Sequence, residues 1–212
     1  MLVSNGSSRR RYRQHGNPFN LHLPIKTIDL NAIFKRLAPI AIDVGCGSGA
    51  FTLELAKQHP EWNIVGIEIR QHLVDCINNE ASTLGLANIH ALLANINLHL
   101  EAIIPPQSVI WVSINFPDPW YKKRHQKRRV VNQEWVKLLK TRLVTGAQIH
   151  CMTDYQPIAE EIKNIFESIK GFINLDGSGN FAHTTTSGII SERERTHLRR
   201  GESIYRLRFC LE

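Results

Sequence analysis

The chain has 212 residues, of which 42% are hydrophobic and 21% charged, and its formal net charge is +7. This length and composition indicate a folded protein with one sizeable domain. They argue against a membrane protein or a secreted one. No apolar stretch approaches the length of a bilayer crossing, and the polar, basic start of the chain lacks the apolar segment of a signal peptide. We therefore expect a cytoplasmic protein that makes no contact with membranes.

The cysteines give no sign of a disulfide framework or a metal centre. They are widely separated in the sequence, at Cys46, Cys76, Cys151 and Cys210. No two of them form a Cys-x-x-Cys pair, the spacing typical of zinc ligands and redox-active thiols. We therefore expect reduced thiols and no metal site.

The basic residues gather in three clusters. An excess of positive charge favours anionic partners through phosphate contacts and counterion release, although it can also form a merely solvated surface. Clustering favours nucleic acid over the solvated surface. The clusters are Arg9–Arg11 with Arg13, Lys122–Arg129, and Arg193 with Arg195, Arg199 and Arg200.

The order of the predicted elements indicates an α/β protein. Residues 1–20 are basic and contain glycine, serine and proline, so we expect a flexible arm before a single domain at 21–212. Strands alternating with helices predict a three-layer sheet that is parallel where the crossovers are helical. The predicted strands cover 40–44, 63–69, 89–94, 109–114, 147–153, 172–175 and 203–211. The predicted helices cover 50–58, 72–84, 132–145 and 157–170, and 176–188 is predicted to be a mobile loop.

A glycine-rich loop follows the first predicted strand. Asp43 is followed by Gly45, Gly47 and Gly49, and Glu68 lies at the end of the next strand. Glycines let the backbone turn sharply and approach a ligand closely, although they also form simple strand-to-helix turns. The loop lacks the Gly-Lys-Ser/Thr of a phosphate-binding loop and the Gly-x-Gly-x-x-Gly of a dinucleotide-binding loop.

This loop resembles the first motif of S-adenosylmethionine-dependent methyltransferases. The resemblance implies that the glycines surround the methionine part of the cofactor, while Glu68 binds the ribose hydroxyls. Asn95 follows the third strand, where a polar side chain meets the adenine in that superfamily.

Asp118 lies between two prolines, and a basic run begins four residues after it. Pro-Asp-Pro cannot continue a strand or a helix, so the chain must form a stiff loop there. The run that follows carries six cations within eight residues, namely Lys122, Lys123, Arg124, Lys127, Arg128 and Arg129. We interpret this stretch as a polar reaction or recognition centre beside a bound polyanion, with the cations after Lys122 as possible phosphate contacts.

With this stretch included, the chain from about Pro39 onward resembles the bacterial tRNA (guanine-N7-)-methyltransferases. The matching residues are Phe116–Trp120, the following Lys-Lys-Arg-His, and Thr153-Asp154-Tyr155. The resemblance implies a Rossmann-like class I fold, with a mostly parallel seven-stranded sheet, helices on both faces and an antiparallel last strand. It also implies methyl transfer from S-adenosylmethionine to N7 of a guanine in the variable loop of tRNA, at position 46.

The family's site residues carry over to specific positions of this chain. The cofactor contacts correspond to Asp43, Glu68, Asn95 and Asp118, and the substrate contacts to Lys122, Asp154 and the segment Ser191, Glu192, Arg193 and Glu194. That segment departs from the family's Thr-x-aromatic-Glu, because Arg193 replaces the aromatic residue and adds a cation that can meet phosphate. Asp154 can instead cap a helix or orient a basic side chain.

Asp118 is the candidate catalytic residue. Guanine N7 has a lone pair and no proton, so its attack on the methyl group needs no base. A carboxylate there would position the guanine and stabilise the positive charge that develops on it. Trp120 either stacks on a base or fills the core, and we favour the core.

Three other functions fit less well. An amino-directed nucleic-acid methyltransferase would carry Asn/Asp-Pro-Pro-aromatic, which Asn115–Asp118 does not match. A catalytically silent RNA-binding protein would show a broken glycine loop or no Glu68, and both are intact. A nicotinamide-dependent oxidoreductase would need another glycine spacing. No obligatory protein partner is indicated.

Overall fold

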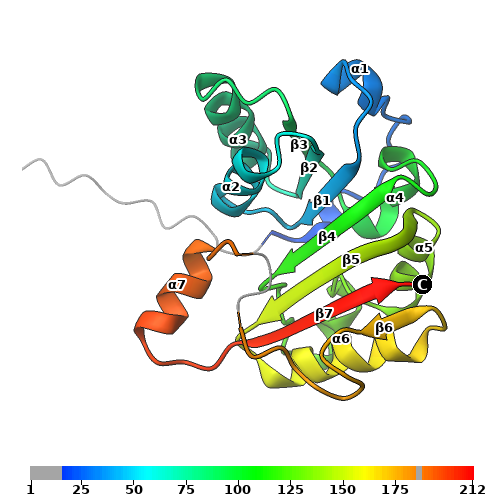
Figure 1. Ribbon diagram of the computed structural model, residues 1–212, viewed down its shortest axis with the longest axis vertical. Helices are drawn as coiled ribbons and strands as arrows, with labels where there is room; N and C mark the ends of the chain where they lie inside the picture. Colours follow the sequence, from blue (N-terminus) through cyan, green and yellow to red (C-terminus); the bar gives the residue numbers. More distant parts are fainter. Residues whose placement is uncertain (1–15, 185–187) are drawn as a thin grey trace, which may run out of the picture.

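A computed structural model describes residues 16–184 and 188–212 as one seven-stranded sheet (Figure 1). The strand order is β3-β2-β1-β4-β5-β7-β6, with β1 to β5 parallel and β7 antiparallel to both of its neighbours. This confirms the expected mostly parallel sheet with an antiparallel last strand. The strands are β1 (Ile40–Val44), β2 (Asn63–Glu68), β3 (Ile89–Leu93), β4 (Val109–Asn115), β5 (Leu143–Thr153), β6 (Phe172–Asn174) and β7 (Tyr205–Leu211).

Helices cover both faces of the sheet and form two apolar cores. On one face α2 (Ala50–Gln58) and α3 (Gln71–Thr83) pack on β1 to β3, where Ala41 and Ile64 face Leu55 and Ile77. On the other face lie α4 (Ile96–Ile103), α5 (Gln133–Lys140) and α6 (Gln156–Ser168). Successive strand residues point to opposite faces, so β1 contributes to both cores. The remaining elements are η1 (Pro18–Asn20), α1 (Leu30–Phe34), η2 (Lys123–Arg128) and α7 (Glu192–Arg199).

The strand order reverses direction between β1 and β4. The chain builds β1, β2 and β3 outward on one side and then returns to place β4 on the other side of β1. In open α/β sheets, ligands bind at such a switch point, outside the carboxyl ends of the strands. Figure 1 shows α7 beyond the carboxyl ends of β4 and β5, at this same edge of the sheet.

One sequence-based prediction of secondary structure was wrong, and some helices were missed. The helix expected over 132–145 starts at its Asn132 cap but ends at Lys140, and the chain enters β5 at Leu143 instead of Ala147. Thr141 closes the helix through a hydrogen bond from its N–H to Leu138 O, and the β-branched residues at 144 and 145 favour a strand. Helices α1, α4 and α7 were not expected, although Asn95 caps α4 and its Ile96 and Leu100 face the core.

The first residues that the structure describes lie against the domain. Residues 1–15, which make up most of the predicted arm, lie outside the described part. The side chain of Asn95 donates to Pro18 O at 3.0 Å, and His99 contacts Leu23 O at 2.9 Å. In the predicted loop, 185–187 are not described, while Lys163 donates to Gly179 O at 2.9 Å.

Within 16–184 and 188–212, no helix is long and apolar enough to cross a membrane. In the same residues, no group of three or more His, Cys, Asp or Glu side chains gathers to hold a metal ion. The four cysteines are free thiols, and Cys46 and Cys151 are buried.

Candidate active site

The glycine loop after β1 presents open backbone to the switch point. Gly45 and Gly47 have φ angles of 75° and 58°, a region that side chains disfavour. A Cβ added at Gly45 would meet nothing within 4 Å, so a ligand can approach the backbone there. Gly49 has another role. A Cβ there would lie 2.4 Å from Cγ1 of Ile77, so this glycine lets α2 start close against α3.

Asp43 is enclosed by the protein. Its side chain is 1% exposed and accepts hydrogen bonds from Thr52 Oγ1 at 2.6 Å and Ser113 Oγ at 2.8 Å. Burial raises the pKa of this carboxyl from 3.8 to about 6, against the opposing effect of the two hydroxyl hydrogen bonds. Asp43 therefore ties β1 to α2 and β4, and its charge acts on the glycine loop at short range.

Glu68 at the end of β2 is almost saturated with donors. Its carboxylate accepts from the backbone N–H groups of Gly47 at 3.0 Å, Ile69 at 2.8 Å and Arg70 at 3.1 Å. The Arg70 guanidinium adds two more hydrogen bonds, at 2.9 Å and 3.0 Å. A carboxylate offers about four lone-pair sites. A ribose diol would therefore bind Glu68 by replacing the guanidinium of Arg70.

Asn95 lies at the end of β3 and caps α4. Its Oδ1 accepts from Asn97 N at 3.2 Å, and its Nδ2 donates to Pro18 O. The amide is thus a paired donor and acceptor at the same sheet edge as Glu68. An acceptor carboxylate, an amide and an open glycine backbone on successive strands fit the ribose, adenine and methionine parts of S-adenosylmethionine.

Asp118 lies in a turn with unusual backbone geometry. Phe116 and Trp120, on either side of it, have φ angles of 51° and 43°, which non-glycine residues rarely adopt. Phe116 N donates to Met152 O at 2.7 Å and Arg129 Nε donates to Pro119 O at 2.9 Å, so both ends of the turn are held.

The guanidinium of Arg70 binds the candidate cofactor carboxylate and lies within electrostatic range of the candidate catalytic one. The pKa of Arg70 is raised chiefly by its hydrogen bonds to Glu68, and also by the negative charges of Glu68 and Asp118. Glu68 and Asp118 therefore lie close enough to act on the same side chain. The carboxyl ends of β2 and β4 lie on either side of β1 at the same edge of the sheet.

The basic run after Asp118 divides into exposed and engaged cations. Arg129 forms an ion pair with Glu161 of α6. The guanidinium of Arg128 lies over the rings of Trp120, at 5.0 Å, and Phe19, at 5.4 Å. The exposed cations are Lys122, Lys123, Arg124 and Lys127, and the ammonium of Lys127 also lies over the Phe19 ring at 5.6 Å.

The expectation that Trp120 fills the core was wrong. Its indole is half-buried and lies beneath Arg128, with the His125 ring edge-on at 6.0 Å. A flat aromatic face attracts a guanidinium, and this contact keeps the indole at η2.

The segment Ser191–Glu194 forms the start of α7. Ser191 caps the helix by accepting from Glu194 N at 3.1 Å. The Glu194 side chain is 0% exposed and accepts from Arg206 at 2.7 Å and 3.1 Å, which joins α7 to β7. Glu192 and Arg193 are exposed. Of the four predicted substrate contacts in this segment, Ser191 and Glu194 therefore shape the helix, and Glu192 and Arg193 are exposed, although Arg193 also contacts Asp154 and Phe116.

Asp154, after β5, faces α7. Its carboxylate pairs with Arg193 at 3.2 Å and lies 3.7 Å from Nε2 of His197. Of the uses expected for Asp154, orienting a basic side chain is the one that this structure displays.

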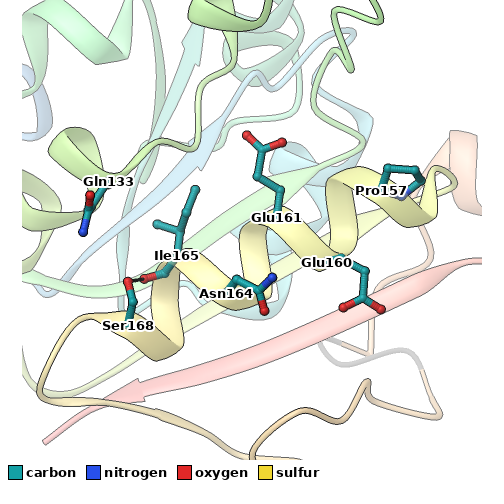
Figure 2. Close-up of a pocket in the computed structure, with 7 residues that line it drawn as sticks. All are labelled: Gln133, Pro157, Glu160, Glu161, Asn164, Ile165 and Ser168. Carbon is teal, nitrogen blue, oxygen red and sulfur yellow. Dashed lines mark hydrogen bonds between the residues drawn. The ribbon is translucent and has the colours of Figure 1, made fainter.

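An open hollow of about 620 Å³ lies elsewhere, on the outer surface between α5 and α6. Figure 2 shows its lining side chains spread along α6, with Gln133 of α5 beside them. None of its lining residues is a candidate cofactor or substrate contact. Its lining residues are Gln133, Pro157, Glu160, Glu161, Asn164, Ile165 and Ser168.

The fold and the site together define a class I S-adenosylmethionine-dependent methyltransferase. The structure resembles the 16S rRNA methyltransferase KamB, with a TM-score of 0.64 and 14% identity over 89% of this chain and 95% of that one. It also resembles the aminoglycoside resistance methyltransferase NpmB1, with a TM-score of 0.55 and 17% identity over 86% and 92%. These likenesses concern the fold.

Sequence comparison narrows the class to one family. Residues 37–207 match the model of a family described as "Putative methyltransferase". A tRNA (guanine-N(7)-)-methyltransferase of Microcystis aeruginosa is 36% identical over 94% of this chain and 97% of its own length. One from a Synechococcus strain is 39% identical over 93% and 84%. The chain belongs to the tRNA (guanine-N7-)-methyltransferase family, whose methyl donor is S-adenosylmethionine.

Several side chains that shape the site escaped the sequence reasoning. Thr52 and Ser113 hold Asp43, and Arg70 holds Glu68. Arg70 had a visible signal, because it lies two positions after the carboxylate that it binds. Thr52 and Ser113 had none, since only the packing of α2 and β4 against β1 brings them to Asp43.

Proposed function

We propose that this chain methylates N7 of a guanine in tRNA, and that the guanine lies in the variable loop at position 46. The observation that carries the proposal is that Glu68 binds the Arg70 guanidinium, Asp118 lies within electrostatic range of the same guanidinium, and exposed cations begin four residues after Asp118. A carboxylate suited to the ribose, a carboxylate suited to the guanine and a surface suited to phosphates thus lie in sequence along one sheet edge.

The cofactor would be held by the loop after β1, with Glu68 on the ribose and Asn95 near the adenine. When bound, it would supply an electrophilic methyl group on a sulfonium, and the C–S bond would break as the bond to N7 forms. The charge of Asp43 beneath the loop would favour the positively charged methionine end. The glycine backbone of Gly45 and Gly47 leaves room for that end.

Asp118 would orient the guanine and stabilise its developing charge. Its carboxylate can accept from N1–H and the amino group of the base, which fixes the direction of N7. Correct positioning alone can account for several kcal/mol of a barrier. Methylation leaves the purine cationic, so a nearby carboxylate also favours the transition state. No proton has to leave N7, and we therefore assign Asp118 no role as a base.

The tRNA backbone would be bound by the exposed cations of the basic run. Phosphate contacts fix the position of a nucleic acid and carry little base information. We place Lys122 nearest the guanine, because it follows Asp118 most closely, and the exposed cations that follow it on the backbone. Arg128 and Arg129 would support this surface through Trp120 and Glu161. The enzyme would act in the cytoplasm without an obligatory protein partner.

A nucleoside assay tests the proposal. Bulk tRNA is incubated with methyl-labelled S-adenosylmethionine, digested and separated, and the labelled position is then mapped on one purified tRNA. We expect 7-methylguanosine in the variable loop. Labelled N6-methyladenosine, or no label, would refute the proposed reaction, and 7-methylguanosine elsewhere would refute the position.

A single substitution tests the role of Asp118. Asp118→Asn keeps the shape of the side chain and removes its charge. We expect turnover to fall by about 100-fold, while the dissociation constants of cofactor and tRNA change little. Near-normal turnover would show that Asp118 is not the charge-stabilising group.

A further inference from the structure

The aromatic ring of Phe116 contacts two side chains of α7. The guanidinium carbon of Arg193 is 5.1 Å from its centroid. The imidazole of His197 is stacked with it at 5.4 Å, with 14° between the planes. Arg193 and His197 are four positions apart, so they share one face of the helix. This face of α7 therefore meets the residue at which β4 turns toward Asp118.

The same two side chains also bind the residue after β5. Arg193 pairs with Oδ1 of Asp154 at 3.2 Å, and Nε2 of His197 lies 3.7 Å from Oδ2. His197 is in turn paired with Glu202 through Nδ1. Phe116, Asp154, Arg193 and His197 thus form a cluster, here named the α7 clasp, that joins the carboxyl ends of β4 and β5 to the helix.

The helix that carries the clasp is itself fixed to the sheet. Glu194 is fully buried and bound to Arg206 of β7, and Ser191 caps the first turn. Breaking a buried pair of this kind is strongly unfavourable. Arg193, which is adjacent to Glu194, is therefore presented to Phe116 from a rigid base, although its own side chain is 46% exposed.

Phe116 needs such support. Its φ of 51° is unfavourable for a residue with a Cβ, and such a conformation persists only when the surroundings hold it. Phe116 is two residues before Asp118, so a change in its backbone would displace the carboxylate. Arg129 holds the other side of the turn at Pro119 O.

We propose that Arg193 is a positioning residue for the methyl transfer, acting through its stack on Phe116 to hold Asp118 in place. This inference rests on the proposed function of Asp118. It gives a physical role to the residue at which the chain departs from its family's usual aromatic. A guanidinium is planar and stacks on a ring as an aromatic side chain does, so it can replace that residue in the clasp.

Three substitutions of Arg193 separate this role from plain phosphate binding. Arg193→Lys keeps the charge and loses the flat face, Arg193→Tyr keeps a flat face and loses the charge, and Arg193→Ala loses both. The rate to measure is that of a single turnover at saturating tRNA and cofactor. We expect it to fall about tenfold or more in the Lys and Ala variants and to recover most of this loss in the Tyr variant.

If only the charge of Arg193 matters, through contact with phosphate, the three variants should differ in tRNA binding and not in rate. Arg193→Lys would then behave like the parent, and Arg193→Tyr and Arg193→Ala would weaken binding alike while all three retain the single-turnover rate. That result would overturn the proposal. Arg199→Ala is the matched control, because Arg199 is six positions further and projects from another face of α7. We expect it to affect only tRNA binding and its dependence on salt.

A double-mutant cycle supplies the second test. If Arg193 acts through the ring of Phe116, then Arg193→Ala should lower the rate much less in a Phe116→Leu background than in the parent. Equal losses in both backgrounds would show independent effects and refute the clasp. Production of 7-methylguanosine by the parent chain is measured in the same experiment. Its absence would refute the proposed function itself, which separates the two failures.

Discussion

Ionisation of Asp43 should make the stability of this protein fall as the pH rises. The rise of its pKa from 3.8 to about 6 corresponds to about 3 kcal/mol. The folded state holds this proton more tightly than the unfolded state. The resulting stabilisation is fully present below pH 3.8 and is lost as the pH passes through about 6. For this carboxyl alone, the free energy of unfolding is lower than at acid pH by about 1.6 kcal/mol at pH 5 and by about 3 kcal/mol at pH 8.

The comparison with Asp43→Asn isolates this effect. The carboxamide has the same shape and does not titrate, and the hydroxyls of Thr52 and Ser113 can turn to meet it. Urea unfolding of both proteins at pH 5 and pH 8 gives two differences in the free energy of unfolding. We expect the difference to shift by about 1.4 kcal/mol in favour of the variant at pH 8. The same difference at both pH values would refute a raised pKa at Asp43.

Cofactor binding should show the reverse trend. A positively charged ligand over the glycine loop favours the ionised form of Asp43, so binding of S-adenosylmethionine should tighten by up to about tenfold between pH 5 and pH 8. Isothermal titration of the parent and of Asp43→Asn measures this, and the variant should show a much flatter profile. A parent profile as flat as that of the variant would mean that the charge of Asp43 does not reach the cofactor.

Three further predictions follow from contacts in the structure. Gly49→Ala should unfold at much lower urea than Gly45→Ala, because both glycines have positive φ but only the Cβ at Gly49 would lie 2.4 Å from Ile77; equal midpoints would contradict the packing argument. Glu194→Gln should lower the free energy of unfolding by about 3 kcal/mol in urea titrations, since it leaves Arg206 buried without its counter-charge, and a loss below about 1 kcal/mol would contradict this. Neutralising the exposed cations Lys122, Lys123 and Arg124 should weaken the dependence of tRNA binding on salt. In filter-binding experiments, the slope of the logarithm of the tRNA association constant against the logarithm of the salt concentration should fall by about 1 for each cation removed, and an unchanged slope would show that these residues do not contact tRNA phosphates.

The parallel half of the fold was predictable because its signals are local. Buried parallel strands are short continuous apolar runs, and β1 and α2 have the bounds that the sequence indicated. The junction of α5 and β5 could not be predicted from the sequence, because the apolar residues at 143 and 144 fit a helix face as well as a strand. The pairing of Leu143 with Val109 of β4 decides between the two, and that contact is not local.

The candidate site was also predictable only in part. Glu68, Asn95 and Asp118 could be placed at one sheet edge, because each follows a parallel strand and the ends of such strands lie together. The state of each side chain could not be foreseen. Glu194 looks like an exposed acid in an arginine-rich segment, but it is fully buried against Arg206, whose place beside it depends on β7 folding back along β5.

Some arginines of this chain are held by contacts within the protein and others are exposed, and this difference changes how the basic surface should be interpreted. From composition alone, every arginine could contact phosphate. In the structure, however, Arg129 is held by Glu161 and Pro119 O, and Arg206 is buried with Glu194. These side chains fix the turn at Asp118 and the helix beside it. The loop that would meet the guanine is therefore held on both sides by arginines, through Pro119 on one and through the α7 clasp on the other. Because a misplacement of about 1 Å can cost 100-fold in rate, part of the positive charge of this chain would serve catalysis by position and not by contact with RNA.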